Sequence, residues 1–189
     1  RTFEDVLAEA QALGYAESDP TFDVEGIDAA HKLTILASIA FGIPLQFDKA
    51  YTEGITKLTT ADVNYAEALG YRIKHLGVAR RMGNGVELRV HPTLIPADRL
   101  LANVNGVMNA VITEGKPVGE SVLQGEGAGP GPTSSSLLSD LISILRGNIR
   151  FPFGIPSNKR KSIKSFNNNN YKNSLYLRFE VKDKPGVLS

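Results

Sequence analysis

The chain has 189 residues, 42% of them hydrophobic, and a mean hydropathy of -0.12, values typical of a globular protein with one sizeable core. It contains no cysteine, which excludes disulfides, thiolate metal ligands and a cysteine nucleophile, and which fits a cytoplasmic location. Its longest nearly continuous apolar run, Leu33 to Leu45, is shorter than the roughly 20 residues of a membrane-spanning helix, so we expect no contact with a membrane.

The net charge of +1 conceals an uneven distribution of charged residues along the chain. The first 145 residues hold 11 Lys and Arg against 18 Asp and Glu, whereas residues 146–172 hold seven Lys and Arg and no acid. A basic stretch can contact nucleic acid, but this one lacks aromatic residues interleaved at base-stacking positions. We therefore expect no nucleic-acid partner.

The first half of the chain predicts three helices and one short extended segment. Apolar residues recur at helical spacing, and a glycine stands where each helix should end. Asp23 is predicted to cap the second helix, and Thr59 or Thr60 to cap the third. The predicted elements are a helix over 2–14, a helix from Asp23 to about Phe41, an extended segment over 51–55 and a helix over 60–69.

The second half of the chain changes to a period of two, which is typical of strands. Residues 82–85 carry a hairpin turn signal between the first two strands. The predicted elements are strands over 71–80, 86–92, 105–112 and 120–124, a helix over 134–145, a linker over 146–173 and a strand over 175–181. Helices followed by consecutive strands predict an α+β fold in which helices cover a mixed or antiparallel sheet.

The polar stretch between the first two helices is the strongest candidate for chemistry. It holds five carboxylates between Glu17 and Asp28, and Lys32 follows Asp28 by four residues, which places both on one face of a helix. The carboxylates could bind the ammonium and hydroxyl of a small zwitterion while the lysine moves a proton. The alternative is an acidic loop with a surface ion pair worth about 0.3–0.5 kcal/mol. A calcium loop is disfavoured because the D-x-D-x-D-G spacing is absent.

A glycine-rich loop over residues 125–133 lies between a predicted strand and a predicted helix. Backbone N–H groups at a helix N-terminus favour an anion or a closely approaching ligand, although many such loops are only tight turns. The loop is not the dinucleotide fingerprint, because Pro130 stands where the third glycine should be. His31, His75 and His91 lie in separate predicted elements and indicate no metal site or catalytic triad, and His31 is expected to face solvent.

Residues 14–33 resemble the signature of homoserine dehydrogenases, which is roughly G-[YF]-x-E-x-D-P-x-x-D-[LV]-x-G-x-D-x-x-x-K. The segment Gly125-x-Gly127-Ala128-Gly129-x-x-Pro132-Thr133 is similar to the later glycine loop of that family. Residues 175–188 resemble the opening strand and Asp-x-Pro-Gly turn of an ACT domain, which monofunctional bacterial members carry at the C-terminus. Phe22 departs from the pattern, because many members have an acid at that position.

The resemblance implies an oxidoreductase that interconverts L-aspartate 4-semialdehyde and L-homoserine with NADP or NAD, in threonine and methionine biosynthesis. Lys32 would be the proton donor and acceptor, and Asp28 would assist it. The implied site residues are Lys32 and Asp28 for catalysis, Glu17, Asp23, Tyr15 and Lys32 for the substrate, and Gly127, Ala128 and Gly129 for the cofactor, with no metal.

The resemblance also implies a domain organisation. Residues 1–147 would form the catalytic and dimerisation domain of a homo-oligomer, either a dimer or a tetramer, followed by a basic linker over 148–173 and the truncated start of an ACT domain over 174–189. The family's N-terminal Rossmann domain is not part of this sequence, so we expect the chain alone to be inactive. The alternative function is a non-catalytic amino-acid-binding or dimerisation module with an ACT regulatory segment.

Overall fold

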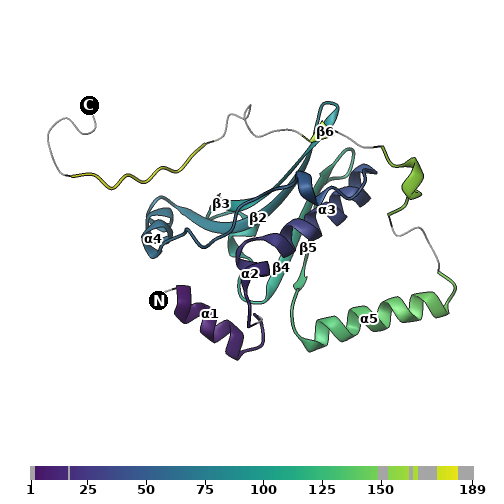
Figure 1. The fold of residues 1–189 in the computed structure, drawn as a ribbon, viewed down its shortest axis with the longest axis horizontal. Coiled ribbons are helices and arrows are strands. Elements are labelled where there is room, and N and C mark those ends of the chain that lie inside the picture. The colour runs from purple at the N-terminus through teal and green to yellow at the C-terminus, as the bar shows by residue number, and fades with distance from the viewer. Residues whose placement is uncertain (1–2, 17, 149–152, 162–163, 166–173, 183–189) are drawn as a thin grey trace.

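The computed structural model describes residues 3–16, 18–148, 153–161, 164–165 and 174–182. Figure 1 shows two sheets, helices arranged around them and a long C-terminal segment. The helices are α1 (Phe3–Ala12), α2 (Thr21–Val24), α3 (Ile27–Phe41), α4 (Thr60–Ala68) and α5 (Pro130–Leu145), with 3-10 turns η1 (Phe47–Lys49), η2 (Leu100–Asn103) and η3 (Ser157–Lys159). The strands are β1 (Tyr51–Thr52), β2 (Tyr71–Met82), β3 (Gly85–Pro96), β4 (Met108–Gly115), β5 (Gly119–Glu126) and β6 (Lys164–Ser165).

The main sheet is built on the hairpin of β2 and β3. The two strands are antiparallel and pair without interruption from Tyr71 opposite Pro96 to Met82 opposite Gly85. On its other edge β3 receives β1 and β6, both of which run parallel to it. Strands β4 and β5 form a separate antiparallel hairpin. These pairings confirm the predicted α+β fold with a mixed sheet and the predicted turn between β2 and β3.

The hydrophobic core lies between α3 and one face of the main sheet. Ala30, Leu33 and Ala37 recur at helical spacing on α3 and are buried against alternate residues of β3, which are Val86, Leu88 and Val90. Burial of the leucine and valine side chains stabilises the fold by roughly 1.5–3 kcal/mol each, and burial of the two alanines by less. This packing fixes the orientation of α3 on the sheet. The opposite face of its first turns is therefore accessible at the surface.

The start of α3 differs from the prediction that Asp23 caps it. Asp23 lies inside the short helix α2, and α3 begins only after Gly26, which has a φ of 76°. A left-handed residue cannot continue a right-handed helix, so Gly26 divides one predicted helix into two. The start of α5 also differs, because it begins at Pro130 instead of Ser134. Proline is favoured in a first helical turn, where no N–H donor is needed.

The predicted strand over 175–181 is wrong for this structure. Residues 174–182 contain no strand, because no described segment pairs with their backbone, and a strand needs a neighbour to share its hydrogen bonds. Their side chains instead reach α4, where the hydroxyl of Tyr176 donates to Oδ1 of Asp62 at 3.2 Å and Nε of Arg178 lies 3.1 Å from the same oxygen. The predicted linker also contains short regular elements, namely η3 and β6.

Candidate functional site

Asp28 and Lys32 lie in the first two turns of α3 and are in contact. Nζ of Lys32 donates to Oδ2 of Asp28 at 2.6 Å, which confirms the predicted pairing of the two side chains. Their side chains are 66% exposed for Lys32 and 41% exposed for Asp28. Water screens an ion pair this exposed, so its contribution to folding stability is small. The ammonium can therefore leave the carboxylate for a ligand at little energetic cost.

The other predicted substrate residues lie on the chain just before this pair. Asp23 is exposed on α2, which packs against α3. Tyr15 follows α1 and is 48% exposed, and its backbone N–H donates to the carbonyl of Ala10 at 2.9 Å. A backbone contact from Tyr15 to a ligand would therefore come from its carbonyl oxygen. Glu17 lies outside the described residues.

His31, the neighbour of Lys32, is exposed as expected but is not simply free in solvent. Its ring packs edge-on against Phe47, with centroids 4.2 Å apart, and against Phe22, with centroids 5.8 Å apart. Edge-to-face aromatic pairs of this kind contribute about 0.5–1.5 kcal/mol beyond their buried area. The three rings join α2, α3 and η1 beside the Asp28–Lys32 pair. Phe22 of α2 thus has a packing role against α3.

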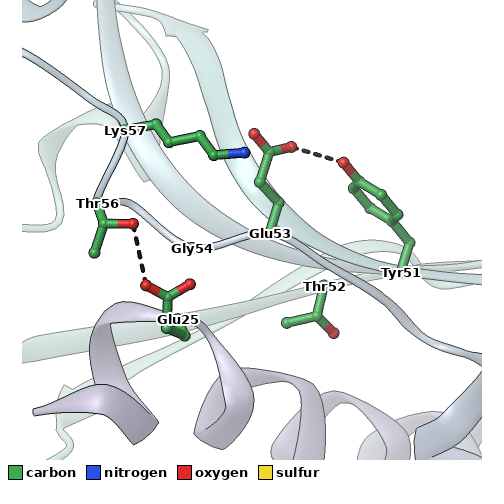
Figure 2. A pocket seen from close by; sticks show the side chains of 7 residues that line it. All are labelled: Glu25, Tyr51, Thr52, Glu53, Gly54, Thr56 and Lys57. Carbon is green, nitrogen blue, oxygen red and sulfur yellow. Dashed lines mark hydrogen bonds between the residues drawn. The ribbon is translucent and has the colours of Figure 1, made fainter.

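A cavity of about 250 Å³ lies between Glu25, in the turn that joins α2 to α3, and the segment of residues 51–57. Figure 2 shows two hydrogen bonds in its wall: Oγ1 of Thr56 donates to Glu25 at 3.0 Å, and the hydroxyl of Tyr51 donates to Glu53 at 2.8 Å. The bond to the Glu53 carboxylate raises the pKa of Tyr51. The lining residues are Glu25, Tyr51, Thr52, Glu53, Gly54, Thr56 and Lys57. Because no predicted substrate or cofactor residue lines it, this cavity is not the predicted site.

The glycine loop joins β5 to α5 and is held against the start of β4. The N–H of Gly127 donates to the carbonyl of Val107 at 3.1 Å. A side-chain carbon added at Gly127 would overlap the amide of Asn109, whose Cγ would be only 2.6 Å away. Gly129 has a φ of 107° and directly precedes α5, and a carbon added there would meet only Cδ of Pro132, at 3.9 Å. The loop is therefore held on one side at Gly127 and is open at Gly129, where the backbone leaves room for a ligand beside the start of α5.

Lys74 holds the segment that leads into β4. Its Nζ donates to the carbonyl of Val104 at 2.5 Å and to Oδ1 of Asn105 at 3.1 Å. Burial, reinforced by the nearby charge of Arg72, lowers the pKa of Lys74. Its ammonium is thus engaged by backbone and amide oxygens, which indicates a structural role for this second lysine.

Two residues near the predicted site were missed by the sequence analysis. Asn109 contacts Gly127 from β4, and no local pattern indicated it, because the two residues come together only through the pairing of β4 with β5. Gly26 has its own signal, a glycine within an otherwise helical pattern. Within the part of the chain that the structure describes, no group of three or more His, Cys, Asp or Glu could hold a metal ion. No described helix is long and apolar enough to cross a membrane.

Comparison with known proteins gives the family. A family model described as homoserine dehydrogenase matches residues 1–142. The homoserine dehydrogenase of Pseudomonas aeruginosa is 64% identical over 200 residues, which cover 100% of this chain and 45% of that protein. The crystal structure of a homoserine dehydrogenase from Thiobacillus denitrificans is 65% identical, with a TM-score of 0.74 over 78% of this chain and 34% of the other. The structure of a hyperthermophilic archaeal homoserine dehydrogenase in complex with NADPH is 30% identical with a TM-score of 0.59, over 78% of this chain and 41% of the other.

These matches define an oxidoreductase family, and the chain belongs to the homoserine dehydrogenases. The chain spans less than half the length of the curated relatives that it matches.

Proposed function

We propose that this chain forms the substrate-binding part of an enzyme that interconverts L-aspartate 4-semialdehyde and L-homoserine with NADPH or NADH. The observation that supports it best is the 2.6 Å contact between Lys32 and Asp28 on exposed turns of α3, within the region that matches the family. The names of the relatives favour this function over a non-catalytic amino-acid-binding module. A binding module would also leave the exposed proton-carrying pair without a role.

Lys32 acts as the proton donor in the reducing direction. The cofactor, when bound, supplies hydride to the aldehyde carbon, and the carbonyl oxygen takes a proton from the Lys32 ammonium. The ammonium also stabilises the negative charge that develops on this oxygen. Asp28 holds the ammonium in place, with Nζ of Lys32 and Oδ2 of Asp28 2.6 Å apart. In the reverse direction Lys32 accepts the proton from the hydroxyl of homoserine.

Asp23 and Glu17 bind the amino-acid end of the substrate, because a carboxylate is the natural partner of an α-ammonium. Tyr15 contributes a backbone contact. The exposed position of Asp23 on α2, next to the helix that carries Lys32, supports this assignment.

Gly127, Ala128 and Gly129 approach the nicotinamide of the bound cofactor. The support for this assignment is the open backbone at Gly129 and the NADPH that the archaeal relative binds. Substitution of Gly129 would strain the loop, because its φ of 107° is one that other residues rarely adopt.

We also propose the wider organisation that the sequence predicts. Residues 1–147 form the catalytic and dimerisation domain of a homo-oligomer, a dimer or a tetramer, residues 148–173 link it onward, and residues 174–189 begin an ACT domain. The protein acts in the cytoplasm on the route to threonine and methionine. The contacts of Tyr176 and Arg178 with Asp62 would then join the regulatory part to the catalytic domain.

The role of Lys32 can be tested in a chimera in which this chain replaces the matching region of the Pseudomonas aeruginosa homoserine dehydrogenase. The Lys32→Ala variant should lower kcat for aspartate-semialdehyde reduction by about 100-fold or more, because a positioned general acid contributes about 10²–10⁴. Lys49→Ala, which removes another exposed lysine, should leave kcat within about twofold.

The chimera also separates the two candidate functions. A folded chimera that binds NADPH but reduces no aspartate semialdehyde, beside an active unaltered Pseudomonas enzyme, would favour the non-catalytic module. Near-normal turnover by Lys32→Ala would remove Lys32 from the mechanism.

A further inference from the structure

His75 is a polar side chain on the core-facing side of β2. Alternate residues of β2 face α3 there: Gly77 lies under Leu33, where an added carbon would be 3.3 Å from its Cδ1, and Ala79 packs against the core. His75 is two residues before Gly77 and therefore points to the same face, although it is a titratable residue. A histidine in this row needs a partner, because burial of an unpaired polar group is costly.

The ring of His75 lies against the turn that precedes α3. A side-chain carbon added at Gly26 would be 2.7 Å from Cε1 and 3.0 Å from Nε2 of His75, and 3.2 Å from Cγ1 of Val90. Gly26 is buried and has a φ of 76°. Only glycine satisfies both the conformation and the lack of space, so the start of α3 rests directly on this ring.

The same ring is bonded to the segment that follows β1. Nε2 of His75 lies 2.8 Å from the carbonyl oxygen of Glu53. A carbonyl can only accept a hydrogen bond, so Nε2 carries the proton. His75 therefore joins β2, the turn before α3 and the segment after β1 with one side chain.

The segment after β1 contacts the turn between α2 and α3 as well, through hydrogen bonds and a close approach of Gly54. The N–H of Ile55 donates to the carbonyl of Val24 at 2.8 Å, and Oγ1 of Thr56 donates to Glu25 at 3.0 Å. A carbon added at Gly54 would be 2.6 Å from the carbonyl oxygen of Val24. Figure 2 shows Gly54 and Thr56 beside Glu25. The turn is thus enclosed between His75 and residues 54–56.

We propose that His75 is a positioning residue for the reaction. It fixes the turn at residues 24–26, which directly follows Asp23 and precedes Asp28, and so sets how α2 and α3 present Asp23, Asp28 and Lys32 to the substrate. The inference rests on the proposed function. A displacement of about 1 Å in a catalytic group can cost up to about 100-fold in rate, so a contact at the base of the helix can act on turnover.

The test compares three variants of the chimera described above. His75→Leu keeps the bulk of the side chain but removes the N–H donor, whereas His75→Gln places an amide N–H near the position of Nε2. His91→Leu is the matched control, because His91 is also half-buried and bonded to a backbone carbonyl, that of Pro92 at 2.8 Å, but lies on the opposite face of the sheet. Each variant is assayed well below its unfolding midpoint, with the folded fraction measured by circular dichroism.

His75→Leu should lower kcat by about tenfold to a hundredfold with KM for NADPH unchanged, since the glycine loop lies on the other hairpin. His75→Gln should restore kcat to within about threefold, and His91→Leu should leave it unchanged. A kcat for His75→Leu equal to that of His91→Leu would overturn the inference, as would equal loss in the Leu and Gln variants. If Lys32→Ala is inactive while His75→Leu is normal, the proposed function stands and only the role of His75 fails.

Discussion

At the scale of single residues, the least expected pair in this chain is Glu87 and Arg89 on β3. Alternation along the strand predicts that both face solvent, opposite the core residues of the same strand. The structure instead buries them, leaving 2% of the Glu87 side chain and 15% of the Arg89 side chain exposed, with Nε of Arg89 3.4 Å from Oε1 of Glu87. The separation is that of an ion pair, but neither atom makes a hydrogen bond in the described structure. Each buried charged group is therefore stabilised by the opposite charge of the other.

Removing one partner of this pair should destabilise the fold more than removing both. Arg89→Leu leaves a buried carboxylate without its counter-charge and should lower the free energy of unfolding by about 3 kcal/mol or more. The double variant Glu87→Leu/Arg89→Leu should cost less than the sum of the single variants, because it leaves no unpaired charge. Urea unfolding of the four proteins in the double-mutant cycle measures the coupling, and strictly additive changes would show that the charges do not interact.

Residue-scale prediction from sequence succeeded where the interacting residues are close in the chain. The contact of Asp28 with Lys32 follows from a spacing of four on a helix. The contacts of Gly26 with His75 and of Gly127 with Asn109 join residues from different elements, so they depend on tertiary packing that no local spacing records.

At the scale of elements, the N-terminus of α4 is closed by a complete capping box. Thr59 and Asp62 form a capping box in which Oγ1 of Thr59 accepts from the N–H of Asp62 at 3.3 Å and Oδ2 of Asp62 accepts from the N–H of Thr59 at 2.9 Å. The Thr59 hydroxyl also donates to Oδ2 at 2.6 Å. Thr59 and Thr60 were the two predicted caps, and the N-cap in the structure is Thr59. These hydrogen bonds hold the pKa of Asp62 below its ordinary value of 3.8.

Thr59→Ala should lower the free energy of unfolding by about 1 kcal/mol, since it removes the cap. Thr60→Ala, one residue further on and without a capping bond, should change it by less than about 0.5 kcal/mol. Because the folded pKa of Asp62 is lowered, its stabilisation is complete above pH 3.8 and is lost as the pH falls through the folded pKa. The difference between Thr59→Ala and the unaltered chain in thermal unfolding should therefore shrink at acidic pH, and a pH-independent difference would contradict this account.

Element boundaries were predicted well for the hairpin of β2 and β3 and poorly around glycine and proline. The period of two and the turn signal define the hairpin from local sequence alone. The split between α2 and α3 depends on the left-handed Gly26, which the space left by His75 and Val90 makes necessary. A local pattern shows the glycine but not the neighbours that require it.

At the scale of the whole molecule, residues 174–182 return to α4 across more than a hundred residues of sequence. Asp62 receives both Tyr176 and Arg178 while it caps the helix. The sequence predicted the fold class, but it predicted a strand here, because strand pattern says nothing about whether a pairing partner is present. Short polar contacts therefore hold this segment to the described domain in place of a ladder of backbone bonds.

Removal of Arg178 should release this segment without unfolding the domain. The side chain of Arg178 is 41% exposed, so its ion pair with Asp62 contributes at most about 1 kcal/mol to the free energy of unfolding. Arg178→Ala should therefore leave the unfolding midpoint nearly unchanged. Cleavage by chymotrypsin after Tyr176 or Phe179 should become several-fold faster than in Lys182→Ala, a matched change in the same exposed segment. Equal cleavage rates in the two variants would show that the contact with Asp62 does not restrain the segment.

The open edge of the main sheet has a consequence for self-association. Among the described strands, β2 pairs with β3 on one side only, so its other side offers a row of backbone donors and acceptors to any extended chain. Its 12 residues include Arg72, Lys74, Arg80 and Arg81 and no acid. A second copy joined edge to edge at β2 would bring these cations within about 5 Å of their counterparts, and like charges at that spacing repel. Repulsion between these cations therefore disfavours edge-to-edge pairing at β2, the strand on which α3 packs, and copies of this chain would have to associate through another surface.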